Sequence, residues 1–167
     1  ECMVLVELLN AIRLSRIALH ARTGKQQYKG HPDLEAFQGF YELCQHPLYY
    51  NGGIESLSDI RQILTRFPLL KGVFIGRGLL SSPLLAKEFK GNETFLPEQR
   101  MSIYFAFHEE LFSAYSQVLQ GETQLLVKMK TLWEYFLPET DRKLLKRIKK
   151  STRLQQYTES VKAIFTS

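Results

Sequence analysis

Two glycine-containing turns hold the residues in this sequence that are best suited to bind an anion. The turns Asn51-Gly52-Gly53 and Gly76-Arg77-Gly78 each follow a short apolar run and precede a stretch with helical periodicity. Glycines leave the backbone amides unobstructed, and amides at the start of a helix attract phosphate. Arg77 adds a charged donor for the same group. Either turn alone is more simply a reversal of the chain, but two turns one helix apart favour a shared phosphate site.

A third group of polar residues follows an earlier apolar run. Residues 16–20 have the composition of a buried strand, which ends in His20-Ala21-Arg22. If the strand continued to residue 22, the side chains of His20 and Arg22 would point toward the same rim. The next loop contains Tyr28-Lys29-Gly30. A histidine at a strand end and a surface lysine are more often packed or solvated than bound to a ligand, so these residues alone do not establish a site.

The elements that must position these residues differ between the two parts of the chain. Up to about residue 90, short apolar runs at 16–20, 48–50 and 72–75 alternate with helical patterns, which is typical of βα units in a parallel sheet. Ser56 and Asp59 form a predicted capping box for one of those helices. From Pro97 onward only helical patterns occur, with breaks near Gly121, Pro138 and Ser151. We therefore predict an α/β domain at 1–92 and an all-α bundle at 93–167.

A cluster of positive charge lies in the second part of the chain. Seven cations fall within the twelve positions 142–153. Such a cluster is either a solvated helix surface or a face that contacts a polyanion such as RNA. On one continuous helix, a single face would present Arg142, Lys146, Lys149 and Arg153.

Composition and cysteine use limit the class of protein. The chain has 167 residues, is 44% hydrophobic and carries a formal charge of +5, which fits an ordered globular protein. Cys2 and Cys44 have no CxxC spacing, so we expect neither a disulfide framework nor a metal site. No apolar run approaches the roughly 20 residues of a membrane span. These features favour a cytoplasmic location without a membrane partner.

Several short segments, in order and spacing, resemble the tRNA-dihydrouridine synthase family. The resemblance covers nearly all of residues 1–90 and continues more weakly into 128–136, a basic and aromatic segment. It implies that the chain is the carboxy-terminal part of a TIM (β/α)8 barrel, with about three parallel strands, followed by a helical tRNA-binding domain. The matching segments are His20-Ala21-Arg22-Thr23, Tyr28-Lys29-Gly30, Asn51-Gly52-Gly53-Ile54 and Ile75-Gly76-Arg77-Gly78.

The resemblance also implies an activity and a role for each matching residue. Enzymes of this family reduce uridine to dihydrouridine in tRNA with FMN, which NADPH reduces, after the uracil has left the base stack. The family usually has an acidic residue at the position of Gly53, so only a backbone contact is expected there. The implied FMN-binding residues are His20, Asn51, Gly52, Gly53, Gly76 and Arg77. The implied tRNA-binding residues are Arg22, Lys29, Lys128, Lys130, Arg142, Lys146, Lys149 and Arg153.

The catalytic cysteine that the resemblance implies has no match in these 167 residues. In the family it follows an Asn-x-Gly-Cys-Pro-like motif, and neither Cys2 nor Cys44 has such a context. We therefore expect this general acid upstream and no activity from the chain alone. Three parallel strands taken from a closed barrel would also expose two edges, which predicts self-association. The alternatives are a non-catalytic RNA-binding fragment and another FMN or phosphate-binding barrel oxidoreductase.

Overall fold

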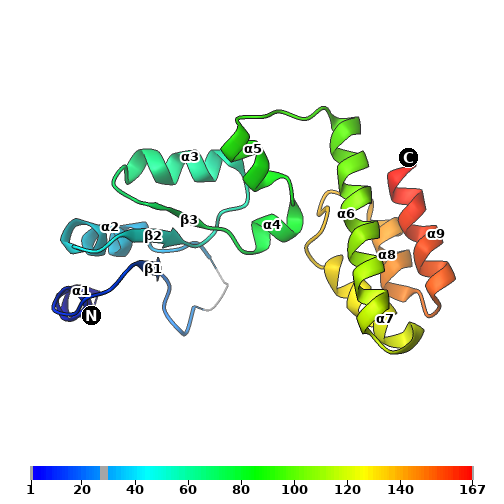
Figure 1. Ribbon diagram of the computed structural model, residues 1–167, viewed down its shortest axis with the longest axis horizontal. Coiled ribbons are helices and arrows are strands. Elements are labelled where there is room, and N and C mark those ends of the chain that lie inside the picture. The colour runs from blue at the N-terminus through cyan, green and yellow to red at the C-terminus, as the bar shows by residue number, and fades with distance from the viewer. Residues whose placement is uncertain (1, 27–29, 167) are drawn as a thin grey trace. The chain divides into compact units, whose positions relative to one another are not determined.

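The structure, a computed structural model, describes residues 2–26 and 30–166 (Figure 1). Contacts within the chain divide it into two compact units, Glu1–Leu79 and Leu80–Ser167. Within the described residues, the first unit contains a sheet with helices and the second contains helices only. No helix in the described part of the chain is both long enough and apolar enough to cross a membrane.

The sheet of the first unit consists of three parallel strands in the order β1-β2-β3, as the sequence predicts. The register pairs His20 with Asn51 and Asn51 with Phe74, so the three strands end side by side. One helix connects each strand to the next, which is the βαβ arrangement (Figure 1). In chain order the elements are β1 (Ile17–His20), α2 (Leu34–Leu43), β2 (Leu48–Asn51), α3 (Leu57–Arg66) and β3 (Gly72–Phe74).

Aromatic side chains hold the connecting helices against the sheet. The Phe37 ring of α2 is fully buried, and its centroid lies 4.9 Å from that of Tyr50 on β2 and 5.0 Å from that of Phe67. Both pairs meet at steep angles, the geometry that aromatic rings favour. At the start of α3, Ser56 and Asp59 form the predicted capping box, so this local signal is confirmed.

Hydrogen bonds attach helix α1 (Cys2–Asn10) to the end of α2 and the residues that follow it, including one from the His46 ring to the Leu9 carbonyl at 2.9 Å. The Asn10 amide donates to the Leu43 carbonyl at 2.8 Å and accepts from the Gln45 amide at 3.0 Å. Elsewhere on the helix, Val4 and Leu8 leave 62% and 64% of their surfaces exposed. Because they are four residues apart, they form an apolar row on one side of α1.

The second unit packs its helices around one apolar core. This core includes Leu84, which precedes α5, so the packing of the unit begins before the predicted boundary at residues 92 and 93. The division into domains at that boundary stays a prediction. Helix α4 (Arg77–Ser81) runs across the division between the two units. The remaining helices are α5 (Leu85–Gly91), α6 (Pro97–Val118), α7 (Gly121–Leu132), α8 (Arg142–Lys150) and α9 (Leu154–Phe165).

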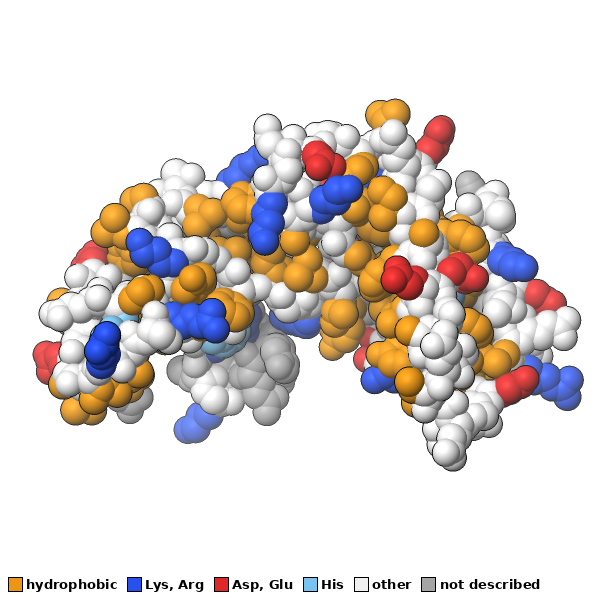
Figure 2. All heavy atoms as spheres, viewed as in Figure 1, with side chains coloured by type: hydrophobic (Ala, Val, Ile, Leu, Met, Phe, Trp, Pro, Cys, Tyr) orange, Lys and Arg blue, Asp and Glu red, His pale blue; other side chains and the backbone are white. Residues whose placement is uncertain are grey.

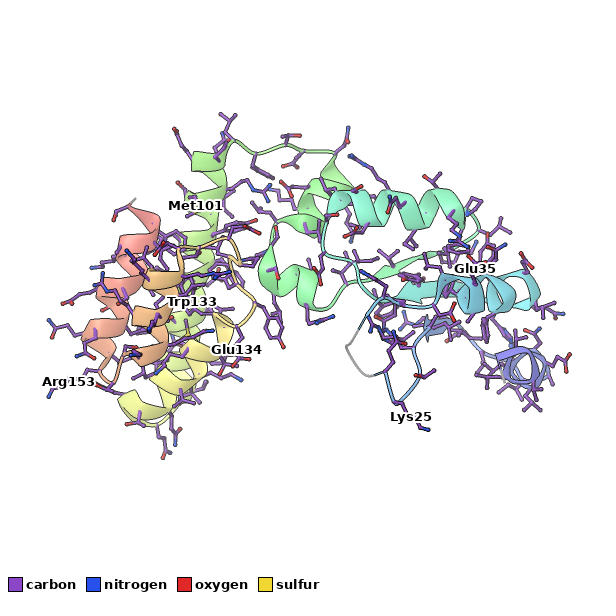
Figure 3. The ribbon with its side chains drawn as sticks, turned by 180° about the vertical axis from the view of Figure 1, so that it is seen from behind. Lys25, Glu35, Met101, Trp133, Glu134 and Arg153 are labelled. Carbon is purple, nitrogen blue, oxygen red and sulfur yellow. The ribbon has the colours of Figure 1, made fainter. Side chains whose placement is uncertain are left out.

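A buried polar network crosses this core. Tyr157 on α9 lies 2.6 Å from Nε2 of His108 on α6, and the Trp133 indole N–H donates to the Tyr157 hydroxyl at 3.0 Å. His108, Trp133 and Tyr157 are at most 2% exposed. The sequence pattern does not indicate these polar contacts, although the aromatic and basic segment around Trp133 carries part of the family resemblance. Figure 3 shows Trp133 inside the helical unit and Arg153 at its edge.

The basic segment 142–153 is not one helix, which corrects the prediction for Arg153. Helix α8 ends at Lys150 because Ser151 leaves the helical conformation and its hydroxyl donates to the Ile148 carbonyl at 2.6 Å. Arg153 is the residue that precedes α9, and its backbone is extended. Arg142, Lys146 and Lys149 therefore share a helix, whereas Arg153 does not belong to their face.

Candidate phosphate site and basic helix

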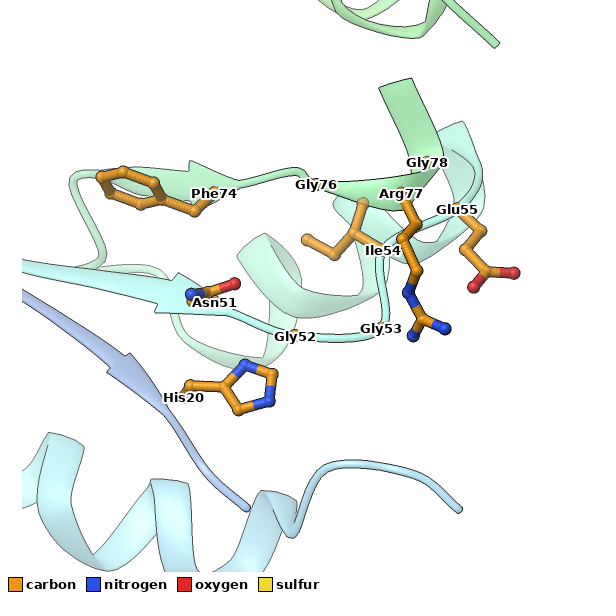
Figure 4. Close-up of a pocket in the computed structure, with 10 residues that line it drawn as sticks. All are labelled: His20, Asn51, Gly52, Gly53, Ile54, Glu55, Phe74, Gly76, Arg77 and Gly78. Carbon is orange, nitrogen blue, oxygen red and sulfur yellow. The ribbon is translucent and has the colours of Figure 1, made fainter. Parts of the chain in front are cut away.

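A pocket of about 340 Å³ lies where the three strands end (Figure 4). Each strand contributes a residue near its carboxyl end, and the two glycine-containing turns complete the lining. In parallel sheets ligands collect at this edge, so its position suits a binding site. The six residues predicted to bind a cofactor all line this pocket. The full lining is His20, Asn51, Gly52, Gly53, Ile54, Glu55, Phe74, Gly76, Arg77 and Gly78.

The 51–53 turn needs glycine for steric reasons. Gly52 has φ +146°, and a Cβ there would lie 2.9 Å from Cγ of Pro32 and 3.4 Å from the His20 ring. Gly53 has φ +60°, a conformation that few side chains adopt. The backbone of this turn therefore passes close to His20 without a side chain between them (Figure 4).

The two turns are in direct contact. A Cβ on Gly78 would overlap the Ile54 carbonyl oxygen, so the first turn of α4 packs on the backbone that follows Gly53. Only glycine permits this approach. The two turns that the sequence singled out thus form one wall of the pocket, at the same edge of the sheet.

Charged and polar side chains face this wall. In Figure 4, the Arg77 side chain extends toward Gly53, and Glu55 contributes a further side chain to the lining. The His20 ring and the Asn51 amide lie on the other side of the pocket. A guanidinium, an amide and glycine backbone form a donor set that suits a phosphate ester. The residues present therefore fit the phosphate end of a nucleotide-like ligand.

The other predicted residues near this pocket have different positions. Strand β1 ends at His20, so the condition for Arg22 to point to the same rim is not met. Instead, Arg22 donates from Nη2 to the Gly30 carbonyl at 2.7 Å, and it is not part of the pocket lining. Burial raises the pKa of Tyr50, and the nearby charge of Arg22 partly opposes this shift. Lys29 lies outside the described residues.

Cys44 lies outside the pocket, and the described residues contain no cluster of metal ligands. Cys44 is the residue that ends α2, and its sulfur contacts the His46 carbonyl at 3.7 Å, away from the pocket lining. Among the described residues, no three His, Cys, Asp or Glu side chains gather in a way that could hold a metal ion.

Helix α8 presents its cations to solvent. Asp141 caps the helix by accepting from the amides of Lys143 and Leu144, and Ile148 is buried on the inner side. Every lysine and arginine of α8 is exposed. By contrast, the face of the helical unit seen in Figure 2 carries both acidic and basic side chains. This concentration of one charge makes α8 the strongest candidate for contact with a polyanion.

Two lysines predicted to contact tRNA make contacts within the protein. Lys130 is half-buried and donates from Nζ to the Ser151 carbonyl at 2.9 Å. The Lys128 ammonium lies 5.4 Å from the centre of the Tyr115 ring, a cation–π distance. Lys130 in particular is used in packing α7 against the end of α8.

The side of α8 that borders α9 carries a second group of cations. A hollow between α8 and α9 is lined by Lys143, Lys146, Arg147 and Lys150, together with residues of α9. We call it the α8–α9 hollow. The spacing i, i+3, i+4 and i+7 of these four cations was a sequence signal for a second stripe. Only the packing of α9 beside it distinguishes this stripe from the predicted face.

Comparison with known proteins identifies the family of this chain. A family model described as "Dihydrouridine synthase (Dus)" matches residues 1–166. The chain is 34% identical over 86 residues to the "Probable tRNA-dihydrouridine synthase" of Aquifex aeolicus (strain VF5), which is 52% of this chain and 27% of that protein. It is 36% identical over 67 residues to the protein of the same name from Rhizobium leguminosarum bv. phaseoli, which is 40% of this chain and 21% of that protein. The chain thus spans well under half the length of these relatives. It belongs to the dihydrouridine synthase family.

Proposed function

We propose that this chain is part of a tRNA-dihydrouridine synthase, an oxidoreductase that converts uridine in tRNA to 5,6-dihydrouridine. The observation that carries the proposal is the packing of Gly78 against the Ile54 backbone directly after the 51–53 turn, which brings both turns into one pocket at the ends of adjacent parallel strands. Family membership and the names of the two relatives support it. In this proposal residues 1–92 are the carboxy-terminal part of a TIM barrel, and residues 93–167 are a helical tRNA-binding domain.

The cofactor in this proposal is FMN, with its phosphate in the pocket. The backbone amides of Gly52, Gly53 and Gly76 and the Arg77 guanidinium would bind the phosphate and the ribityl chain. His20 and Asn51 would contact the rest of the bound molecule from the strand ends. When bound and reduced by NADPH, FMN supplies the hydride for the uracil double bond. This chain's own contribution is to bind and orient the anionic end of the cofactor.

The general acid of the reaction would come from outside these 167 residues. Cys44 ends α2 away from the pocket lining, and Cys2 lies in α1. We therefore expect the chain to bind FMN and tRNA without reducing uridine. Turnover by the isolated chain would contradict this part of the proposal.

Titration of the chain with FMN and with riboflavin, followed by flavin fluorescence, tests the phosphate site. We expect FMN to bind more tightly because riboflavin lacks the phosphate. Arg77→Met should weaken FMN binding about tenfold or more, since it removes a charge-assisted contact. It should leave riboflavin binding unchanged.

Arg61→Met is the matched control for this experiment. Arg61 is exposed on α3 and does not line the pocket, so its loss removes the same charge from the same unit. Equal affinity of the wild-type chain for FMN and riboflavin would refute the phosphate site. Equal effects of the two substitutions would show that Arg77 acts only through general charge.

A further inference from the structure

Helix α8 carries two different stripes of cations, and all four members of one of them line the α8–α9 hollow. The four side chains that line the α8–α9 hollow recur at one-turn spacing along α8. The second stripe, Arg142 and Lys149 with Lys146 shared, lies around the helix from the hollow, and Arg142 and Lys149 do not line it. A ligand in the hollow would therefore contact the first stripe and not Arg142 or Lys149.

The cations of the hollow are not used by the fold. No ion pair joins any of the four to an acidic residue in the described part of the chain. The hydroxyls beneath them are already bonded, because Ser151 donates to the Ile148 carbonyl and Ser160 to the Gln156 carbonyl. Across the hollow, the Glu159 carboxylate accepts from the Gln155 amide at 3.0 Å. The Gln156 side-chain oxygen accepts from the Thr152 backbone amide, so its NH2 group is a neutral donor of the hollow. The charged donors are the lysine and arginine side chains of α8.

Lys130 fixes one end of the hollow. Its ammonium donates to the carbonyl of Ser151, which ends α8 and lines the hollow, at 2.9 Å. This bond ties α7 to the short connection between α8 and α9. The Lys130 ammonium is half-buried and donates to this carbonyl. We therefore expect Lys130 to affect a bound ligand by fixing the position of α8.

We infer that the α8–α9 hollow binds the sugar-phosphate backbone of tRNA through Lys143, Lys146, Arg147 and Lys150. Lys130 is a positioning residue for this site and does not contact RNA. The inference rests on the proposed function and replaces the face predicted from the sequence. Arg142, Lys149 and Arg153 add only long-range attraction, which salt screens.

Two double variants with the same change in charge test the inference. The affinity of the 167-residue chain for an unmodified tRNA transcript is measured at increasing KCl for wild type, K143Q/R147Q and R142Q/K149Q. Removing two phosphate contacts should weaken binding about tenfold and reduce the salt slope by about 1.4–1.8. We expect this result for K143Q/R147Q. R142Q/K149Q should lose less than about threefold, with little change in slope.

The outcomes separate the inference from the proposed function. Equal losses and slopes for the two double variants would overturn the placement of RNA in the hollow, while tRNA binding itself would stand. Absence of tRNA binding by the wild-type chain at low salt would overturn both. Circular dichroism of each variant verifies that the helices are intact, and all four positions are exposed, so these substitutions leave the core unchanged.

Lys130→Met tests the positioning role, with Lys90→Met, at an exposed lysine of the same unit, as its control. Loss of the bond to Ser151 should weaken tRNA binding while the salt slope stays at the wild-type value, since no phosphate contact is removed. Lys90→Met should affect binding less than Lys130→Met. A reduced salt slope in Lys130→Met would identify Lys130 as a direct RNA contact and overturn this role.

Discussion

Replacement of Tyr157 by phenylalanine should destabilise the chain through a single hydroxyl group. An indole N–H can only donate, so the Tyr157 oxygen accepts from Trp133. Burial lowers the pKa of His108, which favours the neutral ring. We assign its hydrogen to Nδ1, which lies 3.1 Å from the Glu109 carboxylate, so that Nε2 accepts from the Tyr157 hydroxyl at 2.6 Å. The phenylalanine ring would keep the packing and remove only these two bonds to the hydroxyl.

The expected loss follows from the two buried groups left without a partner. An unsatisfied buried donor or acceptor costs about 1–3 kcal/mol. His108 Nε2 and the Trp133 N–H both lose their partner in Tyr157→Phe, and both side chains are at most 2% exposed. We therefore expect the free energy of unfolding to fall by about 2–6 kcal/mol.

Urea unfolding followed by far-ultraviolet circular dichroism measures this difference. Tyr135→Phe is the matched control, because Tyr135 lies in the same unit and is 37% exposed. It should change stability by less than about 0.5 kcal/mol. A Tyr157→Phe variant as stable as this control would refute the inference that the two bonds to the Tyr157 hydroxyl stabilise the chain.

Three further predictions concern other parts of the molecule. Gly78→Ala should lower the free energy of unfolding by about 1–3 kcal/mol and weaken FMN binding, because its Cβ would overlap the Ile54 carbonyl. Gly24→Ala is the control and should change neither property, because nothing lies within 4 Å of its Cβ. Urea unfolding and flavin titration of both variants measure the difference. Burial lowers the pKa of His108 in the folded chain, and Glu109 partly opposes this shift. As the pH falls, His108 therefore becomes protonated in the unfolded chain before it does in the folded chain. Stability should therefore fall as pH drops below about 6.5, and His108→Gln should flatten this dependence between urea midpoints at pH 7.5 and 5.5. The exposed apolar row of α1 should promote self-association, and Leu8→Gln should reduce it. Light scattering over a concentration series measures the effect. A wild-type chain that is a monomer at every concentration would contradict this prediction.

Features set by neighbouring residues or by the ends of parallel strands were predictable from the sequence. The capping box of Ser56 and Asp59 spans four residues, so its partners are visible in the sequence itself. His20, Asn51 and Arg77 gather in one pocket because adjacent parallel strands end at the same edge. The roles of these residues toward FMN stay predictions.

Features that depend on packing between distant segments were not predictable. His108 lies 49 residues from Tyr157, and the local sequence around either residue does not indicate a bond between them. Lys130 is predicted to contact tRNA, and only the packing of α7 against the end of α8 reveals its bond to the Ser151 carbonyl. The charge periodicity continues past Ser151, so the sequence predicts a basic face that extends to Arg153. In the structure the Ser151 hydroxyl bonds to the carbonyl of the preceding turn, and the helix ends there.

The tryptophan that binds Tyr157 gives the chain an internal optical reporter. Trp133 is the single tryptophan in the sequence and is 2% exposed in the helical unit. Its emission maximum should shift to longer wavelength when that unit opens and water reaches the indole. Selective excitation of tryptophan would follow the helical unit alone, while the α/β unit would remain silent. Comparison with far-ultraviolet circular dichroism, which reports both units, would then give the order of unfolding without a label.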